Sequence, residues 1–151
     1  MLRVFIVVIT GFFLSPFAAG CGAFAADNQT QSAPISAEGV ELSQFVWTNR
    51  IVVVFADNPA DPAFVDQMQM LAKEPGELAS RDILVITDTD PAARTAIRLK
   101  LRPRGFSLVW IDKDGAVRLR KPIPWSVREL THAIDKTPLR LQEIAEPKPG
   151  R

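Results

Sequence analysis

The stretch Ile51-Val52-Val53-Val54-Phe55-Ala56, followed by the loop Asp57-Asn58-Pro59-Ala60-Asp61-Pro62, decides the fold of this chain. The apolar run has no polar alternation, so it predicts a central strand of a sheet that is covered on both faces. Asp61 can cap a helix and Pro62 fits its first turn, so the loop predicts a strand that leads into a helix. Ligands of open α/β sheets usually bind at this edge. The loop contains no cysteine, histidine, serine or glycine, so the sequence indicates a fold more than a function.

The first 25 residues have the pattern of a cleaved secretory signal. Arg3 is the one charged residue before Asp27, and residues 4–17 are almost all apolar. Ala23-Phe24-Ala25 has the small-x-small form after which signal peptidases cut. We therefore expect a mature chain that begins at Ala26, is periplasmic or secreted, and has no stable membrane span after cleavage.

The one cysteine of the chain, Cys21, lies inside this predicted signal. Ala18-Ala19-Gly20-Cys21 also resembles a lipoprotein processing box, in which the cysteine is lipidated and becomes the new N-terminus. A protein that is lipid-anchored through Cys21 is therefore the alternative localisation. Under either interpretation the folded part has no thiol, which excludes disulfides, thiol catalysis and thiolate metal sites there.

Charge is distributed unevenly along the mature chain. Residues 26–90 contain three basic and eleven acidic side chains, whereas residues 91–128 contain ten basic and two acidic ones. The net charges of these segments are therefore about −8 and about +8, a strong dipole along the sequence. The mean charge gives no sign of nucleic-acid binding, which an exported protein rarely needs, so no nucleic-acid partner is expected.

Periodicity and turn signals predict seven elements between flexible ends. Residues 26–39 are rich in Gln, Ser, Ala and Pro and predict a flexible leader, and residues 144–151 predict a disordered tail. A short turn of helix is expected near 42–47. The predicted strands are 51–56, 83–86, 107–111 and 116–121, and the predicted helices are 62–73, 91–101 and 126–137.

The order of these elements, β-α-β-α-β-β-α, predicts an α/β fold with a four-stranded mixed sheet and helices on both faces. Two βαβ-type strands should be parallel, and the closing hairpin at Asp112-Lys113-Asp114-Gly115 should be antiparallel. In the last strand, Val117 and Leu119 are expected to face inward. This is the topology of a thioredoxin-like domain, which we assign to residues 40–143.

Several motifs strengthen this assignment through resemblance. Residues 108–115, Leu-Val-Trp-Ile-Asp-Lys-Asp-Gly, resemble the strand and turn of peroxiredoxin-like proteins. Trp47-x-x-Arg50, Arg81-Asp82 and Ile134-Asp135…Pro138-x-Arg140 resemble a bacterial domain-of-unknown-function family. That family is similar to the DUDES-type, peroxiredoxin-like domain of some animal extracellular matrix proteins. The resemblance covers about residues 42–143, and it implies fold and export rather than a defined activity.

The resemblance does not extend to thiol chemistry. Redox thioredoxins place Cys-x-x-Cys after the first strand, where the helix dipole lowers the thiol pKa. Those positions fall on Pro59 and Pro62 in this chain. The cis-proline that precedes the third strand in those families falls on Gly105 or Phe106, and Pro103 lies too early. We therefore predict that the chain is not a thiol oxidoreductase.

Four carboxylates are expected at the same edge of the sheet: Asp57, Asp61, Asp88 and Asp90. Oxygen ligands suit Ca²⁺ or Mg²⁺, so a metal-dependent enzyme is one alternative function. Asp61 and Asp90 have structural roles as helix N-caps, however, and acids at these positions complement the helix dipoles. The same acids disfavour phosphate binding there. We therefore predict no metal site and no cofactor.

A second group of candidate residues is basic. Arg94, Arg98 and Arg102 are spaced one helical turn apart, so the second helix is expected to present a positive stripe, joined by Lys100 and Arg104. This stripe is either an ordinary solvated face or a docking surface for an acidic protein or for an anionic glycan or lipid. Further basic residues protect the edge strand from pairing: Arg118, Arg120 and Lys121.

The two candidate groups are expected to meet. In a thioredoxin-like fold the loop that enters the third strand lies against the loop that leaves the first. We therefore expect Arg102 or Arg104 to pair with Asp57 and Asp61 at the vacant redox position.

Other candidate residues have plainer interpretations. His132 lies on the polar side of the last helix with no serine placed beside it, which indicates a solvated side chain. Met68, Met70, Phe106 and Trp110 suggest a small-ligand carrier as a further alternative, although core packing explains them more simply. The leading hypothesis is an exported, non-catalytic interaction module. Its partner would be an unknown protein or an anionic envelope component bound at Arg94, Arg98, Arg102, Arg104, Asp57 and Asp61.

Overall fold

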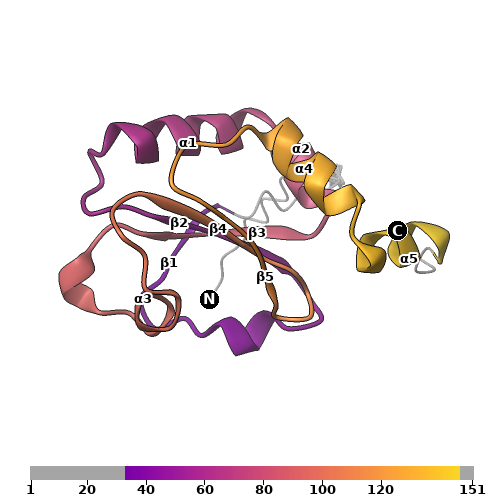
Figure 1. Cartoon of the computed structure of the whole chain (residues 1–151), viewed down its shortest axis with the longest axis horizontal. Helices are drawn as coiled ribbons and strands as arrows, with labels where there is room; N and C mark the ends of the chain where they lie inside the picture. Colours follow the sequence, from indigo (N-terminus) through magenta and orange to yellow (C-terminus); the bar gives the residue numbers. More distant parts are fainter. Residues whose placement is uncertain (1–32, 147–151) are drawn as a thin grey trace, which may run out of the picture.

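The computed structural model describes residues 33–146; the predicted signal peptide, the lipidation motif at Cys21 and residues 147–151 lie outside this range. Five strands form one sheet in the order β1-β3-β2-β4-β5 (Figure 1). Their bounds are β1 Ile35–Ser36, β2 Arg50–Phe55, β3 Ile83–Asp88, β4 Ser107–Ile111 and β5 Val117–Lys121. The predicted α/β class is therefore confirmed, with five strands in place of four.

Strand β2 is the centre of the sheet, as its apolar sequence predicts. All six of its residues are buried. It pairs in parallel with β3, with Val52 opposite Val85, and antiparallel with β4, with Val52 opposite Trp110. β4 and β5 form the expected antiparallel hairpin.

Helices cover both faces of the sheet (Figure 1). Helices α1 (Pro62–Lys73), α2 (Pro75–Ala79) and α4 (Val127–Asp135) lie over one face. The short helix α3 (Ala96–Leu101) and the 3₁₀ turn η1 (Leu42–Phe45) cover the other. The side chains of β2 alternate between the two cores, with Val52 and Val54 on the α1 side and Ile51, Val53 and Phe55 on the α3 side.

Two elements of the structure, β1 and helix α5, were not predicted from the sequence. β1 falls within the predicted leader and pairs in parallel with β3, which adds the fifth strand. Helix α5 (Pro138–Ala145) extends into the predicted tail; Thr137 caps it by accepting a hydrogen bond from the Arg140 N–H. The sequence prediction thus missed a strand within the leader and a helix that lies mostly within the predicted domain. A two-residue strand and a helix with two exposed apolar residues give weak periodicity signals.

The predicted second helix is divided. A 3₁₀ turn, η2 (Pro91–Ala93), is capped by Asp90 and ends at Arg94, whose backbone is left-handed with φ of 47°. Thr95 then caps α3 by accepting a hydrogen bond from the Arg98 N–H. These two N-caps, five positions apart, interrupt the helix, so Arg94, Arg98 and Arg102 do not share one helical face.

The edge strand β5 differs from its predicted alternation. Val117, expected to face inward, is 48% exposed, and Leu119 is half-buried. The pairing of β4 and β5 shifts register between Trp110 and Ile111, which is where Val117 joins the ladder. An irregularity of this kind rotates the following side chains relative to the core.

Candidate functional site

The turn between β2 and α1 is ordered by its own acidic and amide side chains. Asp61 Oδ1 accepts hydrogen bonds from the N–H groups of Ala63 and Phe64 at 2.8 and 3.4 Å, so the predicted N-cap is confirmed. Asn58 Oδ1 accepts one from the Ala60 N–H at 2.9 Å. Residues 57–60 are exposed. The side chains of this turn therefore serve to begin a helix.

The carboxylate of Asp88, at the end of β3, is bound from two sides. Its Oδ1 accepts from Arg98 Nε at 2.9 Å, and its Oδ2 accepts from Thr95 Oγ1 at 2.6 Å. The Asp88 side chain is only 1% exposed. Thr95 thus serves twice, because its hydroxyl also caps α3. The arrangement satisfies a buried carboxylate as a structural ion pair must.

Arg98 joins three elements through the same guanidinium. Its Nη2 donates to the carbonyl oxygens of Ala56 and Asp88 at 2.8 and 3.0 Å, and its guanidinium carbon lies 5.4 Å from the centre of the Phe55 ring. Its side chain is 11% exposed. The expectation that Arg98 belongs to an exposed positive stripe is therefore wrong. Arg98 is a structural residue that holds α3 against the ends of β2 and β3.

The predicted contact between the loops at the vacant redox position is found, but without the predicted ion pair. A Cβ added to Gly105 would lie 3.9 Å from Asp57 Oδ2, so the loop before β4 does reach the loop after β2. No ion pair within residues 33–146 joins Arg102 or Arg104 to an acid, however. Left-handed turns at Arg102 and Gly105 bring backbone, rather than an arginine side chain, against Asp57.

The four carboxylates of this edge do not converge. Asp61 and Asp90 cap their helices, with Asp90 Oδ1 accepting from the Ala92 N–H at 2.8 Å, and Asp88 is held by Arg98. In the described part of the chain, no group of three or more histidine, cysteine, aspartate or glutamate side chains is arranged to hold a metal ion. The geometry here is that of helix capping.

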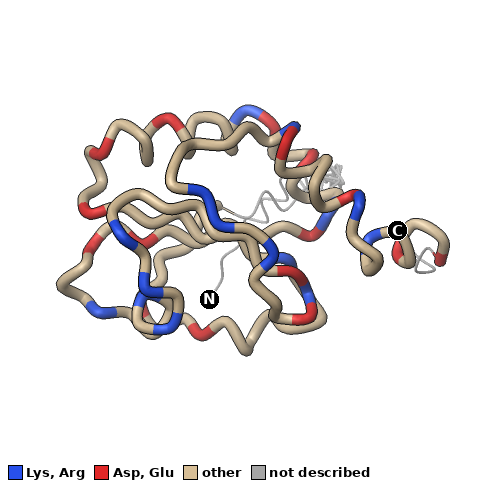
Figure 2. Tube along the Cα trace, in the orientation of Figure 1, with Lys and Arg blue, Asp and Glu red and all other residues tan. Residues whose placement is uncertain are grey.

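Four basic side chains around α3 are exposed: Arg94, Lys100, Arg102 and Arg104. None of the four makes a side-chain hydrogen bond or ion pair with another residue of the range 33–146. On the neighbouring edge strand, Arg120 Nη2 donates to the Leu101 carbonyl oxygen at 2.8 Å, which brings a fifth basic group to the end of α3. Figure 2 shows Lys and Arg gathered along α3, the loop after it and β5. We call these five residues the basic face.

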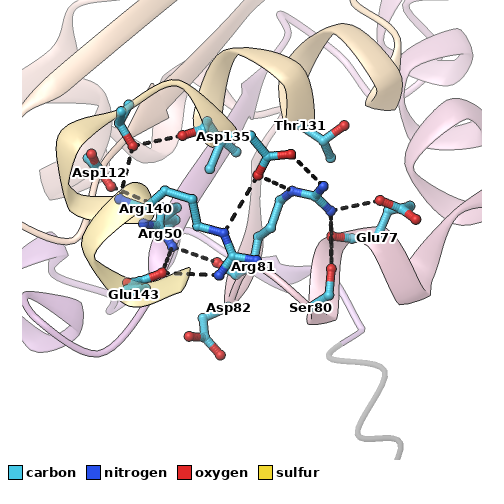
Figure 3. A network of polar contacts seen from close by, with 12 residues as sticks. Arg50, Glu77, Ser80, Arg81, Asp82, Asp112, Thr131, Asp135, Arg140 and Glu143 are labelled. Atoms are coloured by element: carbon cyan, nitrogen blue, oxygen red, sulfur yellow. Dashed lines mark hydrogen bonds and ion pairs between the residues drawn. The ribbon is translucent and has the colours of Figure 1, made fainter. Parts of the chain in front are cut away.

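A further site, not predicted as such, lies at the opposite edge of the sheet (Figure 3). Arg50, the first residue of β2, is fully buried. Its Nε lies 3.0 Å from Asp112 Oδ1, and its Nη1 donates to Glu143 Oε2 at 3.1 Å and to the Arg81 carbonyl oxygen at 3.0 Å. Lys113 Nζ lies 2.7 Å from carboxylate oxygens of both Asp82 and Glu143.

This network extends across the last two helices. Arg81 pairs with Asp135 on α4 at 2.7 Å, and Arg140 on α5 lies 3.6 Å from Asp135 and 3.2 Å from Glu143. Hydrogen bonding to Arg81 lowers the pKa of Asp135, against the effect of burial. Burial alone would raise the pKa of Glu143, but hydrogen bonds from Lys113, Arg50 and Arg140 outweigh it and lower that pKa.

The sequence did contain a signal for this network. Three motifs used above as resemblances, Trp47-x-x-Arg50, Arg81-Asp82 and Ile134-Asp135…Pro138-x-Arg140, supply most of its charged members. Their residues lie far apart in the chain, and the fold brings them together at the amino end of β2 (Figure 3). The network is a structural clasp, because it ties β2, the β4–β5 hairpin, α4 and α5 to one another.

An apolar groove lies beside the outer edge of β3. Its volume is about 410 Å³. Met68, one of the candidate ligand-pocket residues, lines it, but Met70, Phe106 and Trp110 do not. Phe106 and Trp110 belong instead to the core beneath α1 and α4. The other lining residues are Ala33, Pro34, Asn49, Leu71, Ala72, Pro75, Leu78, Ala79, Asp82, Ile83 and Val85.

Two further findings concern His132 and the lengths of the helices. His132 is exposed on α4, as predicted. Within residues 33–146, no helix is long and apolar enough to cross a membrane.

The five-stranded sheet, its strand order and its helical layers define a thioredoxin-like α/β domain. The chain belongs to the family described as Domain of unknown function (DUF4174), whose model matches residues 41–143. A curated relative is coiled-coil domain-containing protein 80 of Danio rerio, which is 25% identical over 134 residues. The match covers 69% of this chain but 16% of that protein, so the chain spans a small part of that relative's length.

Solved structures with a similar fold are thioredoxins and peroxiredoxins. The reduced 2-Cys peroxiredoxin of Plasmodium vivax is 17% identical, with a TM-score of 0.54 over 70% of this chain and 85% of that one. Thioredoxin-2 of the malaria parasite, described as a component of that parasite's protein secretion machinery, is 17% identical, with a TM-score of 0.50 over 70% of this chain and 95% of that one. At these identities the likeness establishes the fold alone.

Proposed function

We propose that the mature chain is an exported binding module of thioredoxin-like fold, without thiol redox activity and without an enzymatic role. The observation that carries this proposal is the composition of the β2–α1 edge. Prolines stand at the two positions where redox thioredoxins carry cysteines, and Asp61 between them is used as a helix cap. The one cysteine, Cys21, precedes the described domain. A thiolate nucleophile is what both thioredoxin and peroxiredoxin chemistry require.

The neighbouring Asp88–Arg98 pair supports the same proposal. A catalytic carboxylate or arginine must be able to reach a substrate, whereas these two are bound to each other and to the ends of β2 and β3. Their contacts are fully explained by the fold. The groups that do face solvent near this edge are Arg94, Arg102 and Arg104 with Asp57. These four exposed residues remain our proposed binding residues. Arg98 and Asp61 leave the predicted set, because Arg98 is internal and Asp61 caps a helix.

The proposed partner is an unidentified protein or an anionic component of the cell envelope. The proposed location is the periplasm or the extracellular space, with lipid anchoring through Cys21 as the alternative. A relationship between this family and the DUDES-type domain of extracellular matrix proteins is a further proposal, which rests on the resemblance of the sequence motifs. A bacterial source for the chain is also proposed, on the resemblance of the three motifs above.

The test is a pair of thiol assays on the mature chain, residues 26–151. We expect neither insulin reduction with dithiothreitol nor hydrogen peroxide consumption above the blank rate. A thioredoxin and a peroxiredoxin serve as positive controls. Turnover above blank that co-purifies with the folded chain through two further chromatographic steps would overturn the proposal.

A second candidate function, a small-ligand carrier, is favoured by the apolar groove beside β3. Its volume of about 410 Å³ lies within the range of small-molecule sites. Ala72 lies in its wall and is exposed, so Ala72→Trp should fill the groove without disturbing the core. Native mass spectrometry of protein purified from its own source would show a bound apolar molecule in the wild type and its loss in Ala72→Trp. Wild-type protein that carries no ligand would count against this function.

A further inference from the structure

The basic face has a net positive charge that the fold leaves unneutralised. Arg94, Lys100, Arg102 and Arg104 are exposed and have no charged partner within residues 33–146, and Arg120 adds a charge beside the end of α3. Three exposed acids lie near these groups: Glu41, Asp57 and Asp90. Exposed acids of α1 and α2, among them Asp66 and Glu77, lie on the other side of the sheet. The five basic groups outnumber the three acids near them, so the basic face keeps a net positive charge.

Two of these arginines occupy backbone positions that favour glycine. Arg94 ends η2 and Arg102 ends α3, and both have φ of 47°. A left-handed conformation is unfavourable for a residue with a Cβ, and glycine is the common residue at such helix ends. Neither arginine gains a side-chain partner in the described domain that would offset this cost. Their side chains are best explained by an interaction outside the domain.

An apolar side chain lies among these charges. Leu99, on the outward side of α3, is 52% exposed, while Ile97 and Leu101 on the inward side are buried. Leu99 stands beside Lys100 and one helical turn from Arg102. Basic groups around an exposed aliphatic side chain match the surface of an anionic bilayer, where cations meet headgroups and the aliphatic group enters the interface. A soluble polyanion would offer Leu99 nothing to bury against.

We propose that the basic face docks onto an anionic phospholipid surface, with Leu99 inserted at the headgroup boundary. This inference rests on the proposed role as an exported binding module and specifies its partner. The side of the sheet covered by α1, α2 and α4 would then point away from the bilayer, so docking also fixes the orientation of the domain. If Cys21 carries a lipid, the twelve residues from it to Ala33 span at most about 40 Å, which keeps the domain near the membrane.

The experiment is sedimentation of the mature chain, residues 26–151, with sucrose-loaded vesicles. One set contains about 30% phosphatidylglycerol in phosphatidylcholine, to approximate an anionic membrane leaflet, and the other contains phosphatidylcholine alone. We expect binding to the anionic vesicles that is lost in high salt, and no binding to the neutral ones. Each basic group near a membrane changes affinity by roughly fivefold. The Arg94→Gly/Arg102→Gly variant should therefore bind at least about tenfold more weakly.

The matched control is Lys73→Ala/Arg128→Ala. Both residues are exposed, and they lie on α1 and α4, on the other side of the sheet. This variant loses the same charge and should bind within about twofold of wild type. The glycine variant should also melt no lower than wild type, because glycine relieves the left-handed backbone. Equal loss in both variants would overturn the proposal, since net charge rather than the basic face would then decide binding.

A Leu99→Gln variant separates lipid from soluble polyanion. We expect it to bind anionic vesicles several-fold more weakly but to elute from a heparin column at the same salt concentration as wild type. Unchanged vesicle binding by Leu99→Gln would overturn the lipid proposal, as would no vesicle binding by wild type. The thiol assays contain no vesicles, so failure of the lipid proposal and failure of the proposed non-redox function are read separately.

Discussion

Arg98 and Asp88 meet at the carboxyl edge of the sheet, where their side chains approach to 2.8 Å and are 11% and 1% exposed. The pair joins a strand to a helix. Asp88 closes β3, and Arg98 belongs to α3, a helix of six residues that could not persist alone. The pair, together with the bond from Arg98 to the Ala56 carbonyl, fixes α3 to the sheet. The position that offers chemistry in related folds is thus used here for structure.

Replacement of Arg98 by methionine should destabilise the protein strongly. The variant leaves the Asp88 carboxylate buried with Thr95 as its remaining side-chain partner. Removal of one member of a buried pair costs about 3–5 kcal/mol, and because Arg98 is slightly exposed we expect about 2–4 kcal/mol. Urea denaturation measures this. The double variant Arg98→Met/Asp88→Leu should recover part of the loss. A cost below about 1 kcal/mol for Arg98→Met would contradict a structural role.

The acids of the β2–α1 turn should differ in their importance. Asp61→Ala removes two hydrogen bonds at the start of α1 and should cost about 0.5–2 kcal/mol. Asp57→Ala and Arg104→Ala alter exposed side chains and should change stability by less than about 0.5 kcal/mol. Thermal melts with and without Ca²⁺ or Mg²⁺ test the metal alternative at the same time. A melting temperature that rises with the logarithm of ion concentration in wild type, but not in Asp61→Ala, would support a metal site.

The central elements of this fold could be predicted because their signals are local. The apolar run at Ile51–Ala56, the Asp61–Pro62 helix start and the Ser126–Glu129 capping box each specify an element within a few residues, and the structure confirms all three. The parallel pairing of β2 with β3 follows from their strand-helix-strand order, but the antiparallel pairing of β2 with β4 does not, because a helix also joins β3 to β4.

The charged contacts could not be predicted in the same way. Whether Arg98 faces water or Asp88 depends on where α3 begins, and Thr95 and Arg94 move that start by several residues relative to a continuous helix. Arg50 contacts Glu143, which lies 93 residues further along the chain, so no local pattern relates them. Motif resemblance marked several of the residues involved, but only the fold shows that they meet.

Gln67 on α1 should be sensitive to substitution, although nothing in the sequence around it indicates a buried side chain. It is fully buried, and its amide group donates to the Trp125 carbonyl oxygen at 3.0 Å and accepts from the Trp125 N–H at 2.7 Å. Gln67→Leu keeps the size but leaves two backbone groups without partners, so we expect a loss of about 2–3 kcal/mol. Gln69→Leu, at an exposed position of the same helix, should change stability by less than about 0.5 kcal/mol. Similar values for the two variants in urea denaturation would refute the bridging role.

Helix α5 should become less stably attached in acid. The pKa values of Glu143 and Asp135 are both lowered in the folded protein. A group whose folded pKa is depressed contributes stability above its unfolded pKa, and that contribution is lost as the pH falls through the folded value. Ordinary pKa values are about 4.3 for glutamate and 3.9 for aspartate, so the loss belongs to the range below about pH 4.5. Protonation of Glu143 would also remove the negative charge that Arg50 and Lys113 share as an ion-pair partner.

A Glu143→Gln variant isolates this contribution. At pH 7 it should be less stable than wild type by about 1–2 kcal/mol, because charge-assisted hydrogen bonds are lost at a partly exposed group. The difference should shrink as the pH falls toward 3, because the contribution of the Glu143 carboxylate is lost as the pH falls through its lowered pKa. Glu146→Gln, an exposed residue at the end of the same helix, is the control and should match wild type within about 0.5 kcal/mol at both values. Urea denaturation at the two pH values gives the free energies, and hydrogen exchange of α5 amides locates the change. If Glu143→Gln differs from wild type equally at pH 7 and pH 3, the stabilisation does not depend on the charge of Glu143, and the clasp must act through packing.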